Sequence, residues 1–493
     1  MLFNQSYLDR KSKQTIKSCM LLLALTSTVT STLTASAFQS RAITTGFVKF
    51  GSLPFKNQNQ NAFRIRHKIP SISLSSMTIP QHGNDASTTV SASASASTPS
   101  AQKAKYISAS EQSLKEAGER LRSGHLVSFP TETVYGLGCH AIDPVAVSRV
   151  FEAKERPFTD PLIVHVNEAQ AALKLWSASS TGNNSTTSNL EQKALIALAD
   201  EFWPGPLTIV ARASPEIPSI IMANTGFVAC RSPSHPIARA LIGASGVPIA
   251  APSANKFGHV SPTRAAHVMD DLAMEDVWIV DPDLDKDSKS DEKQELVCDV
   301  GVESTVAKVE MISETMGRVT ILRHGAVSSS EIAACLDGAN LSASFEVKEK
   351  MQATGENVSH VAPGQTIRHY SPNVQSFMIS HSKYTTDESN VWGEDEVKCL
   401  QSAVVIDFAG RLRSLKDKAL AYRDLSSNGD PNVAAANVFD ALRWSENIEG
   451  AQRVYFPEIL VEEENVCKED ALLLAVKDRL TRAASGVVVE TLQ

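Results

Sequence analysis

Between residues 105 and 330, short apolar segments alternate with amphipathic ones. The apolar segments that we predict as strands cover residues 126–129, 161–166, 207–211, 226–230, 248–251, 301–306 and 319–322. The segments that we predict as helices cover residues 110–122, 144–154, 191–203 and 236–242. Strands that alternate with helices and end in polar loops predict an α/β architecture with a central mixed sheet. The polar runs 178–190 and 283–295 are predicted as loops.

Cationic and hydroxyl side chains follow the ends of several predicted helices and strands. Lys154 and Arg156 follow a helix, while Arg231 and Arg323 each follow an apolar strand. Such cations can neutralise phosphate oxygens, although a lone K-x-R after a helix more often compensates the helix dipole. The loop at 252–261 adds small hydroxyls and an amide. Together these residues predict a cleft for a nucleotide polyphosphate and a small polar molecule.

Several common nucleotide and hydrolase signatures are absent from the sequence. It contains no Walker A motif, no G-x-G-x-x-G fingerprint and no G-x-S-x-G elbow, so neither a P-loop nor an ordinary dinucleotide fold is predicted. His165 interrupts an apolar strand. A histidine in that setting is more often a core residue than a ligand, and it becomes a candidate only through its neighbours.

Length and charge narrow the class of protein further. A chain of 493 residues exceeds what one hydrophobic core usually supports, so two domains are predicted. Seven scattered cysteines without a C-x-x-C pair exclude a zinc ribbon and a dense disulfide scaffold. Beyond residue 104 the chain has 36 basic and 53 acidic residues, which is unfavourable for non-specific nucleic-acid binding.

The first 104 residues have the composition of a targeting leader. Basic residues precede a short apolar core at 19–25, an A-x-A pattern ends at Ala37, and Phe38 follows. No acidic residue occurs from 10 to 84, and residues 87–100 are of low complexity. This arrangement resembles the bipartite plastid leaders of algae with complex plastids, with cleavage near Ala37-Phe38. The alternatives are a disordered extension, mitochondrial targeting or a cytoplasmic protein. No apolar run is long enough to predict stable membrane association.

Seven motifs occur in order along the predicted α/β region: PTETVYGLG at 130–138, KERP at 154–157, PLIVHV at 161–166, WPGPLT at 203–208, PSAN at 252–255, ESTV at 303–306 and LRHGAVS at 322–328. They resemble the YrdC-like domain of the threonylcarbamoyl-AMP synthase family. APGQTIRHYSP at 362–372 is similar to the linker of the long, two-domain form, and residues beyond it resemble the C-terminal domain of that form. The resemblance covers residues 105–493.

The resemblance implies a domain organisation and a fold. A YrdC-like catalytic domain is expected at 105–340, a linker at 341–400 and a Rossmann-like domain at 401–493. The catalytic domain is expected to be a twisted α/β sheet with a concave active-site face. The smaller domain is expected to hold a parallel sheet with flanking helices, and with the linker it would act as a lid over the site.

The resemblance also implies an activity: L-threonine, bicarbonate and ATP are joined into threonylcarbamoyl-AMP with release of diphosphate. A partner transferase then moves the threonylcarbamoyl group to tRNA, so direct tRNA binding is expected to be weak. Mg²⁺ is expected to arrive with ATP. The implied threonine contacts are Thr133, His165, Arg231 and Ser304. The implied ATP contacts are Lys154, Arg156, Asp160, Ser253, Asn255, Ser261, Arg323 and Tyr370, of which Lys154 and Arg156 are the expected catalytic residues.

Three positions depart from the family pattern, and a fourth carries a candidate general base. Asp160 stands where the family usually has an asparagine, and its carboxylate would repel phosphates unless it pairs with Lys154 or Arg156 or helps to hold a metal. Phe227 and Ala251 replace threonines that are common in the family. Glu132 is a candidate general base by residue type, but a structural role is an equal alternative.

Three other functions remain as alternatives. The chain could be an RNA-binding YrdC-like module without synthase activity, although its acidic body argues against this. A carbamoyl-phosphate-dependent transferase of the hydrogenase-maturation type would carry zinc-finger cysteines, which this sequence lacks. A regulatory protein that had lost its activity would not be expected to keep the K-x-R, PSAN and R-H-G motifs.

Overall fold

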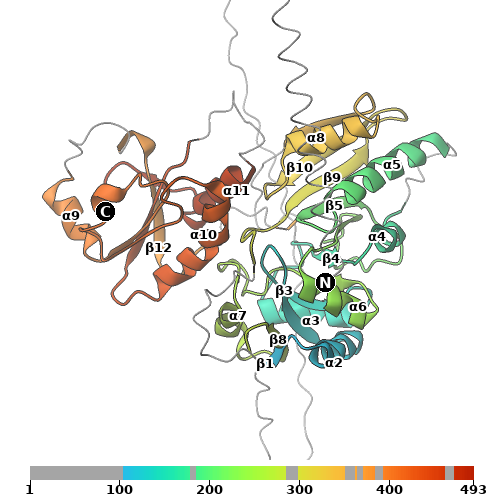
Figure 1. Ribbon diagram of the computed structural model, residues 1–493, viewed down its shortest axis with the longest axis horizontal. Coiled ribbons are helices and arrows are strands. Elements are labelled where there is room, and N and C mark those ends of the chain that lie inside the picture. Colours follow the sequence, from blue (N-terminus) through green and yellow to red (C-terminus); the bar gives the residue numbers. More distant parts are fainter. Residues whose placement is uncertain are drawn as a thin grey trace, which may run out of the picture. The chain divides into compact units, whose positions relative to one another are not determined.

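The computed structural model describes residues 104–177, 185–284, 298–349, 361–363, 370–383, 392–460 and 471–492. Except for Ala104, the predicted leader lies outside these residues. So do residues 285–295 of the predicted charge-rich loop and residues 364–369 of the linker motif. The described chain forms two sheets with flanking helices (Figure 1).

The first sheet has eleven strands in the order β1-β8-β2-β3-β7-β4-β6-β5-β9-β10-β11. It mixes parallel pairs such as β4 with β6 and antiparallel pairs such as β5 with β6, as predicted. Its strands are β1 (Lys105–Ser108), β2 (Leu126–Pro130), β3 (Tyr135–His140), β4 (Ile163–His165), β5 (Leu207–Arg212), β6 (Phe227–Arg231), β7 (Ile249–Ala250), β8 (Val277–Asp281), β9 (Thr305–Met311), β10 (Gly317–Arg323) and β11 (Phe345–Glu349).

The helices of this region begin at residues that cap them well. Ser110 accepts a hydrogen bond from the backbone at the start of α2 (Glu111–Arg122), and Asp143 does the same for α3 (Pro144–Lys154). Small polar side chains at these positions replace the missing backbone acceptors, so both helices lie where the sequence predicts them. The other helices are α4 (Ala169–Leu175), α5 (Ser185–Phe202), α6 (Pro236–Ser245), α7 (Ala265–Leu272) and α8 (Ser329–Gly338).

Two predicted segments differ from the structure. Helix α5 begins at Ser185 rather than Glu191, because a polar Ser/Thr stretch costs little when tertiary packing of Leu195 and Leu198 already holds the helix. Residues 301–304 precede the strand β9 instead of belonging to it. They are buried outside the regular sheet, which places Glu303 and Ser304 in a loop.

Apolar side chains fill both faces of the first sheet. Helices α5 and α8 lie side by side over its β5–β9–β10 part (Figure 1), while α2 and α6 pack together near β2. Val127 and Phe129 from β2 are wholly buried in one core, and Val164 from β4 lies in another. These two cores fix the strand ends from which the polar loops emerge.

The second sheet is entirely parallel and has the order β14-β13-β15-β12-β16, as predicted for the smaller domain. Its strands are β12 (Gln375–Ile379), β13 (Ala403–Asp407), β14 (Ala421–Asp424), β15 (Arg453–Pro457) and β16 (Val488–Val489). Strand β12, like β11 of the first sheet, lies within the stretch 341–400 that was predicted as a linker. The helices are α9 (Glu394–Leu400), α10 (Pro431–Glu446) and α11 (Ala471–Ala483), with short 3₁₀ turns at His381–Lys383 and Arg413–Leu415.

Within the described ranges, no helix combines the length and the apolar character needed to cross a bilayer.

Candidate active site

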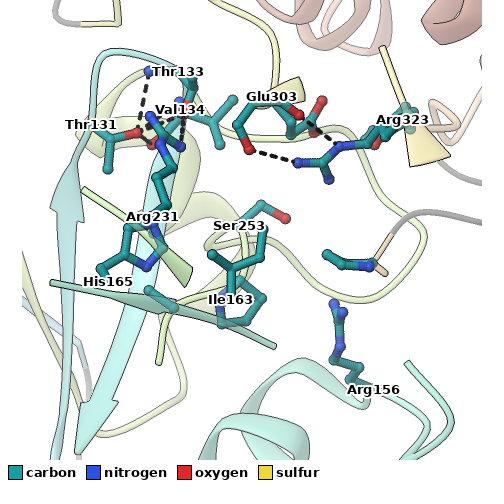
Figure 2. Close-up of a pocket in the computed structure, with 16 residues that line it drawn as sticks. Thr131, Thr133, Val134, Arg156, Ile163, His165, Arg231, Ser253, Glu303 and Arg323 are labelled. Carbon is teal, nitrogen blue, oxygen red and sulfur yellow. Dashed lines mark hydrogen bonds between the residues drawn. The ribbon is translucent and has the colours of Figure 1, made fainter. Parts of the chain in front are cut away.

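A pocket opens where polar loops leave the strands of the first sheet (Figure 2). The segment between β2 and β3, the end of β4 and the end of β6 contribute to one side of it. The loop after β7, the segment before β9 and the end of β10 contribute to the other. The lining consists of Thr131, Thr133, Val134, Gly136, Arg156, Ile163, His165, Arg231, Ala251, Pro252, Ser253, Glu303, Ser304, Arg323, Pro363 and Tyr370. The pocket therefore joins eight of the twelve site residues predicted from the sequence.

Arg231 is the cation of one half of the pocket. Its side chain is buried, and its guanidinium lies 2.6 Å from the carboxylate of Glu132. It also donates to Thr133 Oγ1 at 2.8 Å and to the backbone oxygen of Gly205 at 3.2 Å. Figure 2 shows the guanidinium of Arg231 lying beside Thr133. A fixed, buried fork of this kind suits recognition of a carboxylate.

His165 lies in the same half, at the end of β4. Burial, reinforced by the positive charge of Arg231, lowers the pKa of His165 to about 3. The imidazole is therefore neutral near pH 7. Its Nδ1 atom is buried and has no hydrogen-bond partner among the described residues. A neutral ring with an unsatisfied nitrogen next to the pocket is suited to a hydrogen bond with a ligand.

Glu132 is held in place by Arg231. Burial alone would raise the pKa of Glu132, but the charge and hydrogen bond of Arg231 lower it below its usual value. The carboxylate is ionised and paired, and it is not among the residues that line the pocket. This geometry supports the structural role for Glu132 over the general-base role.

The other half of the pocket carries Arg156 and Arg323. Figure 2 shows these two guanidinium groups across the pocket from Arg231. Arg323 donates to the backbone oxygen and to the hydroxyl of Ser304, both at 3.1 Å. Ser304 also shares a hydrogen bond of 2.7 Å with Thr208, so its side chain is fixed between the two halves. Two arginines with nearby hydroxyls form a setting suited to phosphate oxygens.

Gly325 allows the approach of the segment that carries Ser304. A Cβ atom at Gly325 would lie 2.3 Å from the backbone nitrogen of Thr305 and 2.6 Å from the backbone oxygen of Glu303. Such contacts cannot be accommodated without moving the backbone. The glycine in the R-H-G motif therefore fixes the spacing between Arg323 and the segment 303–305.

Four predicted site residues lie behind the pocket lining rather than in it. Lys154 is fully buried and donates to the backbone oxygens of Ser253, at 2.6 Å, and of Asn255. Burial, with the nearby charge of Arg156, lowers the pKa of Lys154 well below its usual value. The side-chain amide of Asn255 donates within its own loop, to Lys256 and His259. Both residues thus shape the loop that presents Ser253.

The remaining two are Asp160 and Ser261. Asp160 lies 2.9 Å from the guanidinium of Arg156, and both side chains are buried. The pairing that the sequence analysis required for a carboxylate at this position is therefore present. Ser261 donates to Glu303 at 2.6 Å. Direct contacts of Lys154, Asp160, Asn255 and Ser261 with ATP stay predictions.

The two other departures from the family pattern have different surroundings. Phe227 begins β6 outside the pocket lining, and Lys308 Nζ lies 3.9 Å from the centre of its ring. Ala251 lines the pocket, where a Cβ atom added at Gly136 would lie 3.2 Å from its methyl group. Phe227 thus has a cation–π contact in place of a pocket contact, whereas Ala251 lies in the pocket close to Gly136.

Glu303 was not predicted as a site residue, although the ESTV motif contains it. Nor was Arg479 on α11, which lies 3.0 Å from the Glu303 carboxylate. Arg479 lies 176 positions further along the chain, so no local pattern joins the two. The signal that could have found it is a buried-face arginine between the apolar residues Val476 and Leu480.

His259 links the loop after β7 to α10. Its Nδ1 lies 2.9 Å from Asp271 and its Nε2 lies 3.0 Å from Glu446. Burial and the charge of Arg443 lower its pKa, but the hydrogen bonds to both carboxylates outweigh them and raise it to about 9. The group is therefore an imidazolium at neutral pH.

This ion cluster predicts a fall in stability at alkaline pH. The stabilisation is fully present below the unfolded pKa of about 6.5 and is lost as pH rises through about 9. We expect the free energy of unfolding to fall by up to about 3 kcal/mol across this window, as measured by urea denaturation. His259→Gln should flatten the fall, whereas His125→Gln, at a side chain that is 44% exposed, should keep it. An unchanged pH slope in His259→Gln would contradict the assignment.

Two family models match the chain. The Sua5/YciO/YrdC model, described as telomere recombination, matches residues 119–325. The model described as threonylcarbamoyl-AMP synthase, C-terminal domain, matches residues 327–485. The two matches together cover both sheets except the edge strands β1 and β16.

Several curated proteins are similar over long stretches. Threonylcarbamoyl-AMP synthase of Bacillus subtilis is 32% identical over 388 residues, which cover 78% of this chain and 96% of that protein. The enzyme of the same name from Pyrococcus abyssi is 36% identical over 270 residues, covering 55% of this chain and 68% of that protein. The crystal structure of P. abyssi Sua5 complexed with L-threonine matches with a TM-score of 0.60 and 30% identity, over 78% of this chain and 98% of that one.

Proposed function

The chain belongs to the threonylcarbamoyl-AMP synthase family, and from that premise we propose which reaction its pocket carries out. It joins L-threonine, bicarbonate and ATP into threonylcarbamoyl-AMP and releases diphosphate. The relatives that share 32% and 36% identity carry this enzyme name, and the similar P. abyssi structure contains L-threonine.

One observation of the pocket carries the proposal: it has two chemically different halves that meet at Ser304. Thr133, His165 and Arg231 provide a small site with a hydroxyl, a neutral imidazole and one cation. Arg156 and Arg323 provide two further cations on the other side. An amino acid fits the first half and a polyphosphate fits the second, so the acceptor and the donor of the reaction lie next to each other.

The reaction proceeds in two balanced steps. The neutral amine of threonine attacks the carbon of bicarbonate, a C–N bond forms, and water leaves to give a carbamate. A carbamate oxygen then attacks the α-phosphorus of ATP, and the bond to the β-phosphate oxygen breaks to release diphosphate. Because neither step needs a covalent intermediate with the protein, positioning and charge neutralisation are the main contributions of the pocket.

Each half contributes a separate part of that work. Arg231 holds the carboxylate of threonine, and the neutral His165 offers a hydrogen bond without adding charge. Arg156 and Arg323 neutralise the phosphate charge that develops as diphosphate leaves. A pKa of about 3 makes His165 a poor base at neutral pH, so the ammonium proton of threonine passes to solvent water before the amine attacks bicarbonate.

We propose Mg²⁺ as the metal that accompanies ATP. Among the residues that the structure describes, no group of three or more His, Cys, Asp or Glu side chains could hold a metal ion. Magnesium bound to substrate phosphates keeps most of its waters and needs few protein ligands, so these residues are compatible with it. Bound Mg²⁺ would neutralise phosphate charge beside Arg156 and Arg323.

We also propose that the product is consumed by a transferase that acts on tRNA. Threonylcarbamoyl-AMP is a mixed anhydride, so its carbonyl carbon is activated towards an amine and AMP is the leaving group. A second protein that binds tRNA would present the acceptor amine, which belongs to an adenosine of the tRNA. The acidic balance of this chain beyond residue 104 supports a division of labour in which RNA binding lies with the partner.

Diphosphate release tests the proposed function. The full-length protein is incubated with ATP and Mg²⁺, and L-threonine and bicarbonate are omitted in turn. We expect release only when both are present, and we expect excess EDTA to abolish it. Binding of ATP without threonine-dependent release would overturn the proposal and leave a nucleotide-binding protein.

A further inference from the structure

A buried arginine of the C-terminal domain contacts the active-site pocket. Arg479 on α11 is 0% exposed. Its guanidinium lies 3.0 Å from the Glu303 carboxylate and donates to the backbone oxygen of His324 at 2.9 Å. It also lies 5.4 Å from the centre of the Tyr370 ring. One side chain thus contacts two residues that line the pocket and the neighbour of a third, Arg323.

Glu303 needs such a cation. Its carboxylate is buried and lines the same pocket as Arg156 and Arg323. The hydroxyl of Ser261 donates to one of its oxygens at 2.6 Å, and Nε of Arg479 donates to the other at 3.1 Å. Without Arg479 the Glu303 carboxylate would lose its ion pair, and among the described residues it would keep the hydrogen bond from Ser261 and the more distant charge of Arg323. The negative charge of Glu303 would then repel phosphate oxygens.

The segments that carry Glu303 and Tyr370 are packed closely against the C-terminal domain. A Cβ atom at Gly301 would lie 2.4 Å from Cα of Ala436 on α10. Val302 and Tyr370 belong to the same apolar cluster as Phe439 and Leu480. The positions of the two pocket residues therefore depend on this packing as well as on the first sheet.

We propose that Arg479 is a positioning residue that makes binding of ATP depend on the docked C-terminal domain. It neutralises Glu303, holds the backbone next to Arg323 and supports the ring of Tyr370. The threonine half, with Thr133, His165 and Arg231, has none of these contacts. This inference rests on the proposed function, because it assigns the pocket half with Glu303 and Arg323 to ATP.

Steady-state kinetics of diphosphate release by the full-length protein test the inference. In Arg479→Met we expect the KM for ATP to rise at least tenfold while the KM for L-threonine changes less than twofold. Arg479→Lys should lie between this variant and the wild type, since it keeps the charge and loses the fork. In the double variant Glu303→Gln/Arg479→Met, removal of the unpaired carboxylate should recover at least fivefold of the lost ATP affinity.

A matched control removes another contact between the same domains. Asp440 on α10 pairs with Arg264 at 2.8 Å, and neither residue lines the pocket. We expect Asp440→Asn to keep the KM for ATP within twofold of the wild type. Thermal unfolding with and without ATP supplies a readout that does not need activity: ATP should raise Tm in the wild type and in Asp440→Asn, and clearly less in Arg479→Met.

The outcomes separate this inference from the proposed function. An Arg479→Met protein that folds and keeps the wild-type KM and Tm shift for ATP would overturn the inference. Equal losses for ATP and threonine, or a double variant no better than Arg479→Met, would also overturn it. A wild type without threonine-dependent release would instead refute the proposed function. The Tm shifts would then still decide whether Arg479 supports ATP binding. If Arg479→Met does not fold, Arg479→Lys and the double variant provide the same comparison.

Discussion

Replacing Arg231 with methionine is expected to lower kcat/KM for L-threonine at least a hundredfold, which corresponds to about 2.7 kcal/mol of transition-state stabilisation. Arg231 is buried and forms a 2.6 Å ion pair with Glu132 and a 2.8 Å hydrogen bond to Thr133. The substitution removes the cation that faces the threonine carboxylate. It also leaves Glu132 as an unpaired buried charge, a change that typically costs about 3–5 kcal/mol.

A double variant separates loss of binding from loss of folding. Glu132→Gln/Arg231→Met no longer contains the unpaired carboxylate, so we expect its Tm to recover most of what Arg231→Met loses. Its kcat/KM for threonine should stay at least a hundredfold below wild type, while its Tm should still rise when ATP is added. Recovery of threonine kinetics in the double variant would contradict the role assigned to Arg231.

Replacing Arg156 with methionine is expected to lower kcat/KM for ATP at least a hundredfold. Its guanidinium lines the pocket, and removal of one preorganised donor to a developing charge typically costs about 10²–10³ in rate. Arg156 also pairs with Asp160 at 2.9 Å, so the unpaired carboxylate would add repulsion of the phosphates. Asp160→Asn/Arg156→Met should therefore be more active than Arg156→Met, though still well below wild type.

A Lys154→Met variant tests whether Arg156, and not Lys154, acts on the phosphates of ATP. Lys154 was predicted to act on ATP together with Arg156, but its ammonium donates to the backbone oxygens of Ser253 and Asn255. Lys154→Met leaves two buried acceptors unsatisfied, and we expect a loss of about 1–3 kcal/mol in the free energy of unfolding. The KM for ATP should rise through the displaced loop, while kcat falls less than in Arg156→Met. A larger loss of kcat in Lys154→Met would show that its ammonium acts on the phosphates directly.

Much of the fold could be predicted because its signals are local. The caps at Ser110 and Asp143 and the proline at position 144 define helices α2 and α3. The apolar strands that end at His165 and Arg231 were recognisable for the same reason. The start of α5 at Ser185 was not, because packing rather than propensity decides whether a polar Ser/Thr stretch is helical.

The site shows the same division between local and long-range information. Arg231 and Arg323 were identified because each ends an apolar strand. The pairing of Glu303 with Arg479 could not be, since it spans two domains. Lys154 could be identified from the sequence as a candidate cation, but the direction in which its side chain points could not. That direction is set by hydrogen bonds to two backbone carbonyl groups of a loop about a hundred residues later. The plastid leader stays a prediction.

Mass spectrometry of the reaction products tests the central claim most directly. The full-length protein is incubated with ATP, Mg²⁺, L-threonine and ¹³C-bicarbonate, and the products are analysed before the mixed anhydride hydrolyses. We expect threonylcarbamoyl-AMP with a single ¹³C atom, formed only with threonine and strongly reduced in Arg231→Met. Consumption of ATP to AMP and diphosphate without incorporation of ¹³C would contradict the account, because the pocket would then activate some acid other than the carbamate of threonine.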